Sequence, residues 1–554
     1  MVSRIYGGFR GADFRGDEVN LSRSPDLLNV WKDYKETESI RTRPSMRMHF
    51  PVTHKTWGIF SFRGSLMVHD GAMLKWLKPE GTKTIYTGLN QAPSQAFVYD
   101  DLFYIMDGKR YLVFDGETIN DVVGYIPTTT IARKPMGGGE RHEDVNMLSD
   151  YRINTFLADG VSFSFFLDSF NIDSDYAPIV KINDEVVDQT TYTVDYAEGK
   201  IVFTNTPPEP PLTDGQDNVW VQFKKAVPQY KAAIMGCSML QVFDNRVFFS
   251  GNPDHPSMVW HCSLHDPTYI QDLDYYQEGM DEARVTGMVA GNNALWVFRE
   301  PSEANTTVFY HTPTTDEEYG KIYPSVHSSV SVGCIGKAIN FGDDIVFFSD
   351  RGMEGISGDV TTEQAVAHRS SLVDRKLTTE GAYRDMVLAE WEGYLLVFIS
   401  DKAYLADSRT MFQNGNHGEY EWFYWQMDRE VLCAFVKDGV LYLGCEDGVY
   451  TLDGEDSVEA YFVTAKDKFD APHKLKTTNK RGCVGEGTGD LTVLAKTEAT
   501  DFEEVERFDG VRDYFVCRLK RKKFKDLQIK IHSMTRFSLE TVTMECFIGG
   551  YIKR

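Results

Sequence analysis

The chain has 554 residues, of which 42% are hydrophobic and 13% aromatic, and this composition excludes intrinsic disorder and predicts several packed, strand-rich domains. Lys and Arg number 58 against 82 Asp and Glu, so the net charge of −24 disfavours a protein that grips nucleic acid or an anionic membrane. The same charge suits a conduit that lets DNA pass without sticking, and it equally suits a plain soluble acidic protein.

The N-terminal segment, residues 1–50, is polar, and we interpret it as a docking arm. A serine followed by a proline, ahead of DLLNVW, has the residue types preferred at the N-cap and first position of a helix, so a helix is expected there. The apolar pair and aromatics that follow suit packing on something already folded. An arm that merely lies across its own propeller is the alternative. The predicted docking residues are Ser24, Pro25, Leu27, Leu28, Trp31 and Tyr34.

A short phrase recurs seven times, with a turn former followed by a run of apolar or aromatic residues. Its copies are FRGSLMV (Gly64), YDDLFYI (Asp101), FDNRVFF (Asn245), GNNALWV (Asn293), GDDIVFF (Asp344), WEGYLLV (Gly393) and KDGVLYL (Gly439). The steps between these turn positions are 37, 144, 48, 51, 49 and 46 residues, and all but one lie near the length of a four-stranded propeller blade. The pattern predicts an all-β fold with a β-propeller of about seven blades. Chance recurrence of hairpins in a β-rich chain is the alternative.

The one oversized step predicts an inserted β-sandwich at residues 130–232. Period-2 alternation there places common strand faces at Tyr192, Val194, Tyr196, Ile201, Phe203, Val219, Val221 and Phe223. The propeller then divides into residues 51–129 (blades one and two) and 233–465 (blades three to seven). The N-terminal arm or the C-terminal strands could complete a blade. A short helix between two blades is a further candidate within residues 370–391.

Residues 466–554 are predicted to form a C-terminal β domain, because three long segments alternate with period 2. This domain holds the one dense basic stretch of an acidic chain. We weigh two interpretations, a charged edge strand that blocks self-pairing and a contact with an acidic neighbouring subunit or with DNA. The residues of this basic strand are Arg518, Lys520, Arg521, Lys522, Lys523 and Lys525.

No motif predicts catalysis, a metal or a cofactor. The eight cysteines form no CxxC pair and are expected to be buried and reduced. GMVAGNN (287–293) and GEGTGD (485–490) lack the ending of a P-loop. His142, Glu143 and Asp144 are adjacent in a loop, and DGEDSVE (453–459) is expected to be a plain turn. The tryptophans that alternate with Val and Leu are predicted to be blade core rather than carbohydrate platforms; they are Trp296, Trp391, Trp422 and Trp425.

Several stretches resemble the tail stabilisation or nozzle proteins of tailed bacteriophages, a family that extends to podophage tail tubular protein B. The matching phrases, in order along the chain, are GGFRGADFRGDEVNLSRSPDLLNVWKDY with RTRPSM (7–46), VFFSGNPDHPSMVWHCSLHDPTYI (247–270), EWEGYLLVFISDKAYLADSR with EYEWFYW (390–425), and the closing ECFIGGYIKR. The inserted phrase TVDYAEGKIVFTNTPPEPP recurs in many virion proteins.

The resemblance implies a non-enzymatic virion protein whose propeller subunits form a closed ring, a hexamer, below the portal and head–tail adaptor. Such a ring would contact itself, the adaptor and other tail proteins or fibres. Phage DNA would pass through it without sequence-specific binding. With no apolar leader and no stretch near 18 consecutive apolar residues, we expect no membrane insertion and assembly in the host cytoplasm. A propeller hydrolase of host-surface glycans and a sugar- or protein-binding propeller are the rival functions.

Overall fold

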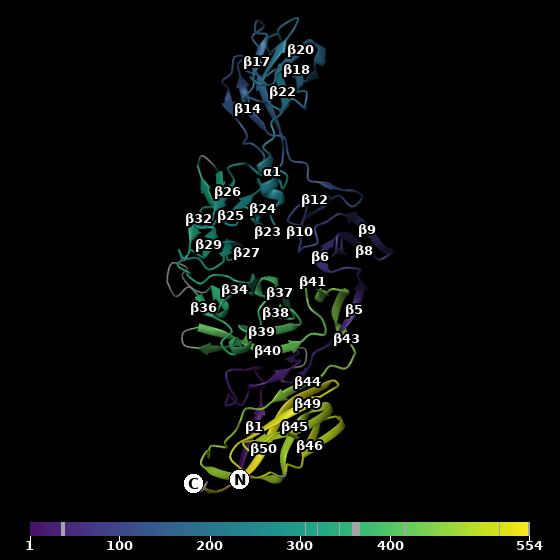
Figure 1. The fold of residues 1–554 in the computed structure, drawn as a ribbon, viewed down its shortest axis with the longest axis vertical. Coiled ribbons are helices and arrows are strands. Elements are labelled where there is room, and N and C mark those ends of the chain that lie inside the picture. The colour runs from purple at the N-terminus through teal and green to yellow at the C-terminus, as the bar shows by residue number, and fades with distance from the viewer. Residues whose placement is uncertain are drawn as a thin grey trace. The chain divides into compact units, whose positions relative to one another are not determined.

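The computed structural model describes residues 1–34, 39–304, 306–317, 320–342, 344–356, 366–414, 417–519 and 521–551 (Figure 1). Contacts divide the chain into two compact units. Unit 1 comprises Met1–Thr87, Phe298–Val308 and Ser328–Arg554, and unit 2 comprises Gly88–Val297 and Phe309–His327. No helix among the described residues is long and apolar enough to cross a membrane.

Seven four-stranded antiparallel sheets in the described residues are the blades of the predicted β-propeller. Blades one and two are β6 (Thr56–Phe62), β7 (Ser65–Asp70), β8 (Met73–Lys78) and β9 (Gly81–Thr87), then β10 (Gln95–Tyr99), β11 (Leu102–Met106), β12 (Tyr111–Phe114) and β13 (Ile119–Asp121). Blades three and four are β23 (Met239–Phe243), β24 (Arg246–Ser250), β25 (Met258–His261) and β26 (Tyr275–Gln277), then β27 (Val285–Gly291), β28 (Ala294–Arg299), β29 (Val308–His311) and β32 (Ser325–His327). A small hairpin in the fourth blade is β30 (Thr314–Asp316) with β31 (Gly320–Ile322).

The remaining three blades belong to unit 1. Blades five and six are β33 (Ala338–Phe341), β34 (Asp344–Ser349), β35 (Gly352–Ile356) and β36 (Val366–His368), then β37 (Val387–Trp391), β38 (Tyr394–Ile399), β39 (Lys402–Asn414) and β40 (His417–Gln426). Blade seven is β41 (Cys433–Lys437), β42 (Val440–Gly444), β43 (Gly448–Gly454) and β5 (Ser45–Pro51). A strand of the N-terminal segment therefore completes the seventh blade, one of the two possibilities that the sequence left open.

Each recurring phrase forms the tight turn between the first two strands of a blade. Such two-residue hairpin turns need positive φ at both central residues, which Asn, Asp and Gly tolerate. Asp244 and Asn245 have φ of 49° and 58°, and Asp438 and Gly439 have 52° and 77°. The turn of the fifth copy falls one residue earlier than predicted, because Phe341 pairs with Asp344 and Asp344 already belongs to β34.

The insertion forms two sheets that share one core, as predicted. A six-stranded sheet contains β14 (Thr128–Arg133), β15 (Glu140–Arg141), β16 (Tyr151–Phe156), β18 (Ile179–Ile182), β19 (Glu185–Val186) and β22 (Val219–Lys224). A three-stranded sheet contains β17 (Ser164–Phe166), β20 (Tyr192–Asp195) and β21 (Lys200–Phe203), with the 3-10 turn η1 (Gln189–Thr191) ahead of β20. Phe156 of the first sheet meets Phe165 of the second edge to face, with ring centroids 5.5 Å apart.

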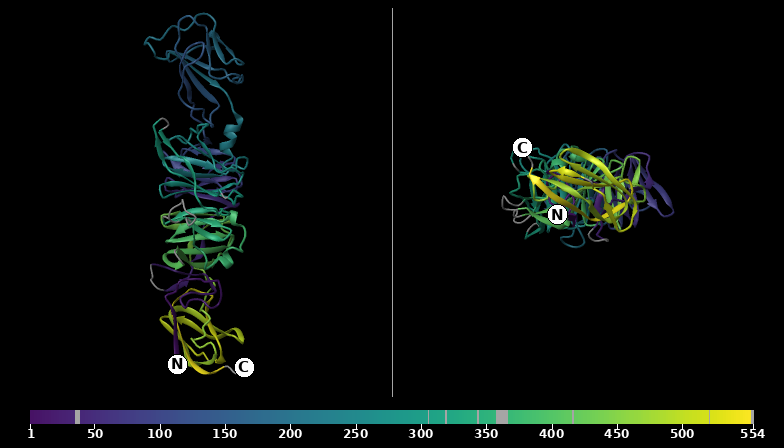
Figure 2. Two further views of the ribbon diagram at one scale, coloured as in Figure 1. Left: turned by 90° about the vertical axis from the view of Figure 1, so that its left-hand side faces the viewer. Right: turned by 90° about the horizontal axis from the view of Figure 1, so that it is seen from below.

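An eleven-stranded sheet joins the two ends of the chain in unit 1. Its strands are β1 (Val2–Gly7), β2 (Leu27–Leu28), β3 (Val30–Lys32), β4 (Ile40–Thr42), β44 (Ala460–Val463), β45 (Lys474–Thr497), β46 (Thr500–Val511), β47 (Tyr514–Cys517), β48 (Lys522–Phe524), β49 (Leu527–Ser533) and β50 (Phe537–Tyr551). Strand β1 pairs with β50, so the first and last strands of the chain are neighbours, and Figure 2 shows the purple N-terminal segment beside the yellow C-terminal strands. The arm is therefore part of this sheet.

Helix is scarce, and the helix expected at Ser24 is wrong. Ser24 instead forms a parallel bridge with Ala12, and its hydroxyl donates to the Val463 carbonyl at 2.7 Å. The Ser24 hydroxyl, which would have capped the helix, is thus bound to a residue far away in the sequence. The short helix expected within residues 370–391 is present as α2 (Asp374–Leu377), followed by η2 (Tyr383–Asp385). Sequence reasoning missed α1 (Pro228–Met235), which has proline in its first turn.

Candidate functional site

The predicted docking residues of the arm lie in contacts within unit 1. Strand β2 pairs with β44, so Leu27 lies opposite Phe462 and Leu28 opposite Tyr461. Ser24 bonds to Val463, and Pro25 lies in the bend that leads into β2. These apolar groups are thus covered by the chain itself.

Trp31 and Tyr34 pack on the sixth blade. The Trp31 ring stacks on Trp391 at 5.5 Å and meets Trp425 edge to face at 5.7 Å. The Tyr34 hydroxyl donates to the carboxylate of Asp407 in β39. The structure therefore has the arrangement that was the alternative in the sequence, an arm lying across its own blades.

The arm also covers the free edge of β40, the last strand of the sixth blade. The Ala12 amide donates to the Trp422 carbonyl at 2.6 Å, and the Asn29 amide donates to the Tyr424 carbonyl at 3.0 Å. The Gln426 amide donates in turn to the side chain of Asn29 at 2.8 Å. Exposed strand edges invite pairing with other chains, and the arm removes this one.

Two buried carboxylates lie opposite each other where β39 and β40 pair, Asp407 and Glu421. Arg23 binds Glu421 through two hydrogen bonds, at 2.7 and 3.1 Å, and Arg10 approaches to 3.8 Å. Burial raises the pKa of Glu421, although both arginines favour its charged form. Tyr34 and Arg409 bond to Asp407. The arm therefore supplies partners to both carboxylates, and an unpaired buried charge would be costly.

Arg43, in the RTRPSM phrase, ties the arm to the sixth and seventh blades. Its guanidinium is completely buried and donates to the side chain of Asn29 at 3.0 Å and to the Gln426 carbonyl at 2.8 Å. It also forms an ion pair with Asp428 at 3.3 Å. The buried guanidinium of Arg43 is therefore hydrogen-bonded and paired entirely by groups of the same chain.

The predicted basic strand lies beside an acidic strand of the same chain. Arg521 pairs with Glu503 of β46 at 2.7 Å, and the Arg518 amide donates to Glu506 of the same strand at 2.8 Å. The Lys525 amide donates to Glu498. Lys522 and Lys523 lie in β48, which pairs with β45, whereas Lys520 lies outside the described residues. The chain thus places acidic groups of its own beside this stretch.

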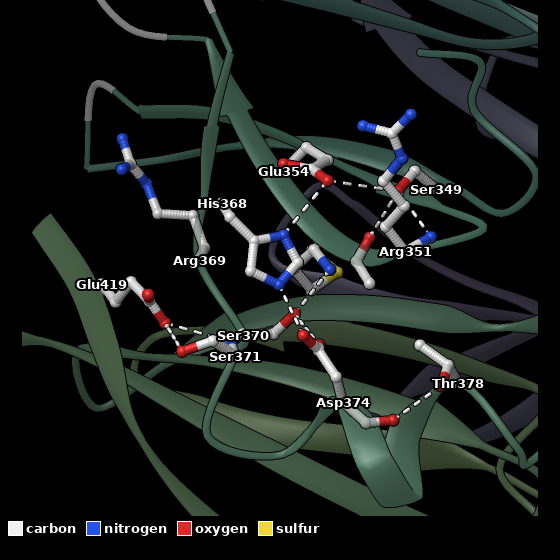
Figure 3. Close-up of polar contacts among 12 residues, drawn as sticks. Ser349, Arg351, Glu354, His368, Arg369, Ser370, Ser371, Asp374, Thr378 and Glu419 are labelled. Carbon is white, nitrogen blue, oxygen red and sulfur yellow. Dashed lines mark hydrogen bonds and ion pairs between the residues drawn. The ribbon is translucent and has the colours of Figure 1, made fainter. Parts of the chain in front are cut away.

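His368 at the end of β36 lies in the constellation that most resembles a catalytic triad (Figure 3). Its Nε2 is 2.5 Å from Asp374 and its Nδ1 is 3.1 Å from Glu354. Burial opposes charge on the imidazole, but the hydrogen bonds to these carboxylates outweigh it and raise the pKa of His368 to about 10. Ser370 donates to Asp374 and not to the histidine. These contacts link β35, β36 and α2 through one imidazole.

The motif NPDHPSMVWHCSLHDPTYI attaches the inserted sandwich to the third blade. The buried Asn146 side chain donates to the carbonyls of Tyr125 and Thr268, both at 2.8 Å, and accepts from the amides of Leu148 and Ile270, both at 3.0 Å. The Asn146 side chain therefore connects three segments: the one before β14, the one after β15, and the loop of the motif. Asn252 of the motif donates to the Ala233 carbonyl of α1.

The described residues contain no group of three or more His, Cys, Asp or Glu placed to hold a metal ion. The acidic pair next to His142 has local partners. Glu143 accepts from the Thr128 amide at 2.6 Å, and Asp144 pairs with Arg141. All eight cysteines are free, and seven of them are buried. The tryptophans Trp296, Trp422 and Trp425 are buried in the blades, and the partly buried Trp391 stacks on Trp31.

No protein-family model matches the sequence, and no curated protein matches it. BamB from Moraxella catarrhalis is 10% identical, with a TM-score of 0.34, over 74% of this chain and 96% of that chain. YCF48 bound to D1 peptide is 8% identical, with a TM-score of 0.32, over 75% of this chain and 98% of that chain. PorZ of Porphyromonas gingivalis is 10% identical, with a TM-score of 0.23, over 95% of this chain and 87% of that chain. These TM-scores are too low to support a fold assignment, so the assignment rests on the strand pairing within this chain.

Proposed function

We propose that this chain is a structural protein of a bacteriophage tail, one subunit of a closed ring that extends or seals the DNA ejection channel. The ring is a hexamer below the portal and head–tail adaptor. It assembles in the host cytoplasm, remains in the virion and contacts other tail proteins or fibres. The subunit has no catalytic role.

One observation carries the proposal: three of the four phrases that resemble the tail nozzle family, although far apart in sequence, lie in unit 1, whereas the phrase at 247–270 lies in unit 2. Arg23 of the first phrase binds Glu421 of the EYEWFYW phrase. Strand β1 borders the first phrase and pairs with β50, which holds most of the closing phrase, so that Val2 lies opposite Cys546. These contacts place parts of the first, third and closing phrases in one structural unit.

The charge of the subunit fits the same role. A ring of subunits that each carry −24 repels the phosphates of DNA, so DNA moves through it without being held. Closed rings of identical subunits need head-to-tail contacts between two different surfaces. The subunit must therefore present two distinct complementary surfaces.

Electron cryomicroscopy of virions from the parent phage tests the proposal. We expect six copies of the chain around the channel axis next to the portal. Mass spectrometry of the same purified particles should detect the chain as a component of the virion. A monomer that is absent from virions and cleaves a host polysaccharide would refute the proposal and favour the glycan hydrolase.

A further inference from the structure

A groove of about 440 Å³ lies in unit 1 where the arm, the seventh blade and the C-terminal sheet meet. Its volume is in the range of ligand-binding clefts. The buried residues that line it are Trp31, Thr42, Leu452, Gly454 and Phe537, whereas Arg536 lies at its exposed rim. The groove therefore joins an apolar floor to a cationic edge.

The floor holds a polar atom that lacks a partner. Trp31 is 5% exposed, and its indole N–H has no hydrogen-bond partner among the described residues. Buried polar groups in folded proteins are nearly always paired, so an orphaned donor calls for an explanation. A ligand that brings an acceptor into the groove would supply the missing bond.

The rim holds a cation without a carboxylate. Two carboxylates line the groove, and each already has its own arginine. Asp33 pairs with Arg41 at 3.0 Å, and Asp453 pairs with Arg47. Arg536 donates to the Gly454 carbonyl, and the ion pairs of the described residues include none for it. The groove thus contains a guanidinium without a carboxylate, that of Arg536, and an indole N–H without an acceptor, that of Trp31. Together they indicate a ligand with an anionic acceptor.

Strand β46 of the chain has matching acidic chemistry. Strand β46, with the sequence TDFEEVERFDGV, pairs only with β45 among the described strands, so it is an edge strand. Asp501, Glu504 and Asp509 on it are exposed. The ion pairs of Asp501 with Lys496, at 3.9 Å, and of Asp509 with Arg507, at 3.5 Å, are the exposed kind that contributes little.

We propose that the groove binds the acidic edge strand β46 of a second copy of this chain, with a carboxylate meeting Arg536 and an acceptor reaching the Trp31 N–H. This inference rests on the proposed ring, because it supplies two different surfaces that meet head to tail. The contact would repeat around the ring, since each subunit carries both the groove and the strand.

Titration of the full chain with a capped peptide of residues 500–511 tests the contact, followed by calorimetry and by tryptophan fluorescence. We expect binding that weakens as salt rises. Arg536→Ala should weaken it at least tenfold, and Trp31→Phe several-fold. Arg110→Ala removes a partly exposed arginine of the second blade and should leave the affinity unchanged. A peptide with its Asp and Glu residues replaced by Asn and Gln should not bind.

Three results would overturn the inference: no binding at millimolar peptide, equal binding to the Arg536→Ala chain, or equal binding of the uncharged peptide. Circular dichroism of each variant confirms that it is folded. If virions that carry Arg536→Ala still contain the ring, the groove is not the contact between subunits, and the proposed tail function is unaffected. Peptide binding by a chain that is absent from virions would refute the tail function and leave the groove standing.

Discussion

Arg23→Met tests whether the arm is needed to fold the sixth blade. The substitution keeps the apolar stem of the side chain and removes both hydrogen bonds to Glu421, which is fully buried. Removing one partner of a buried ion pair costs about 3–5 kcal/mol. Arg10, 3.8 Å from the same carboxylate and about half exposed, compensates in part, so we expect a loss near the lower end, about 3 kcal/mol.

Urea unfolding followed by fluorescence measures the loss, because Trp422 and Trp425 flank the site in β40. The loss should depend on pH in a defined direction. Without Arg23, the buried carboxyl of Glu421 has a pKa raised further above its unfolded value of about 4.3. A raised folded pKa in an acid means that stability falls as pH rises above the unfolded value. The variant should therefore be closest to the wild type near pH 4 and weakest at neutral pH.

Arg47→Met is the matched control, because Arg47 also pairs with a carboxylate, that of Asp453, but at the surface, where ion pairs contribute little. Its unfolding midpoint should equal that of the wild type. The double variant Arg23→Met with Glu421→Leu removes the stranded charge and should recover most of the loss. If Arg23→Met costs less than about 1 kcal/mol, or if the double variant is no more stable than the single one, the arm does not hold the blade in this way.

Three further predictions concern other buried or partly buried polar groups. His368→Gln should destabilise the chain at pH 7, because the raised pKa of His368 stabilises the fold fully below about pH 6.5 and this contribution is lost as pH rises through about 10; thermal unfolding across this range measures it. Asn146→Leu leaves three backbone groups without partners, because the Thr268 carbonyl still accepts from the Tyr125 amide; we expect a loss of several kcal/mol at about 1–3 kcal/mol each, and faster hydrogen exchange at the Leu148 and Ile270 amides, and unchanged exchange there would contradict it. Burial raises the pKa of Asp274 to about 7, so its carboxyl costs stability as pH rises from about 4 to about 7, and Asp274→Asn should raise the unfolding temperature at pH 8 but not at pH 4.

The blades could be predicted from the sequence because their signal is local. A two-residue turn such as Asp438-Gly439 restricts φ at both positions, and period-2 alternation then fixes which flanking residues are buried. The recurring spacing counts the sheets without any knowledge of their partners. For the same reason, the buried faces of the insertion follow directly from alternation in residues such as Val219 and Phe223.

The arm could not be predicted in the same way, because its structure depends on partners more than 350 residues away. Ser24 and Pro25 have the local signal of a helix start. The hydrogen bond of Ser24 to Val463 and the pairing of Leu28 with Tyr461 favour a strand instead. The pairing of Arg23 with Glu421 leaves no pattern in either segment alone. His368 lies only 6 residues from Asp374 and 14 from Glu354, but their spacing matches no motif that predicts the cluster.

The position of the arm constrains when the subunit becomes competent to assemble. Strand β5 completes the seventh blade against β43, and β1 pairs with residues 541–546 of β50. Neither pairing can form until the C-terminal part of the chain has been made, and contacts between such distant residues form slowly. The groove between the arm, β43 and β50 consequently exists only in the completed subunit. If that groove receives the neighbouring copy, an unfinished chain has no site through which to join a ring, and assembly is limited to whole subunits.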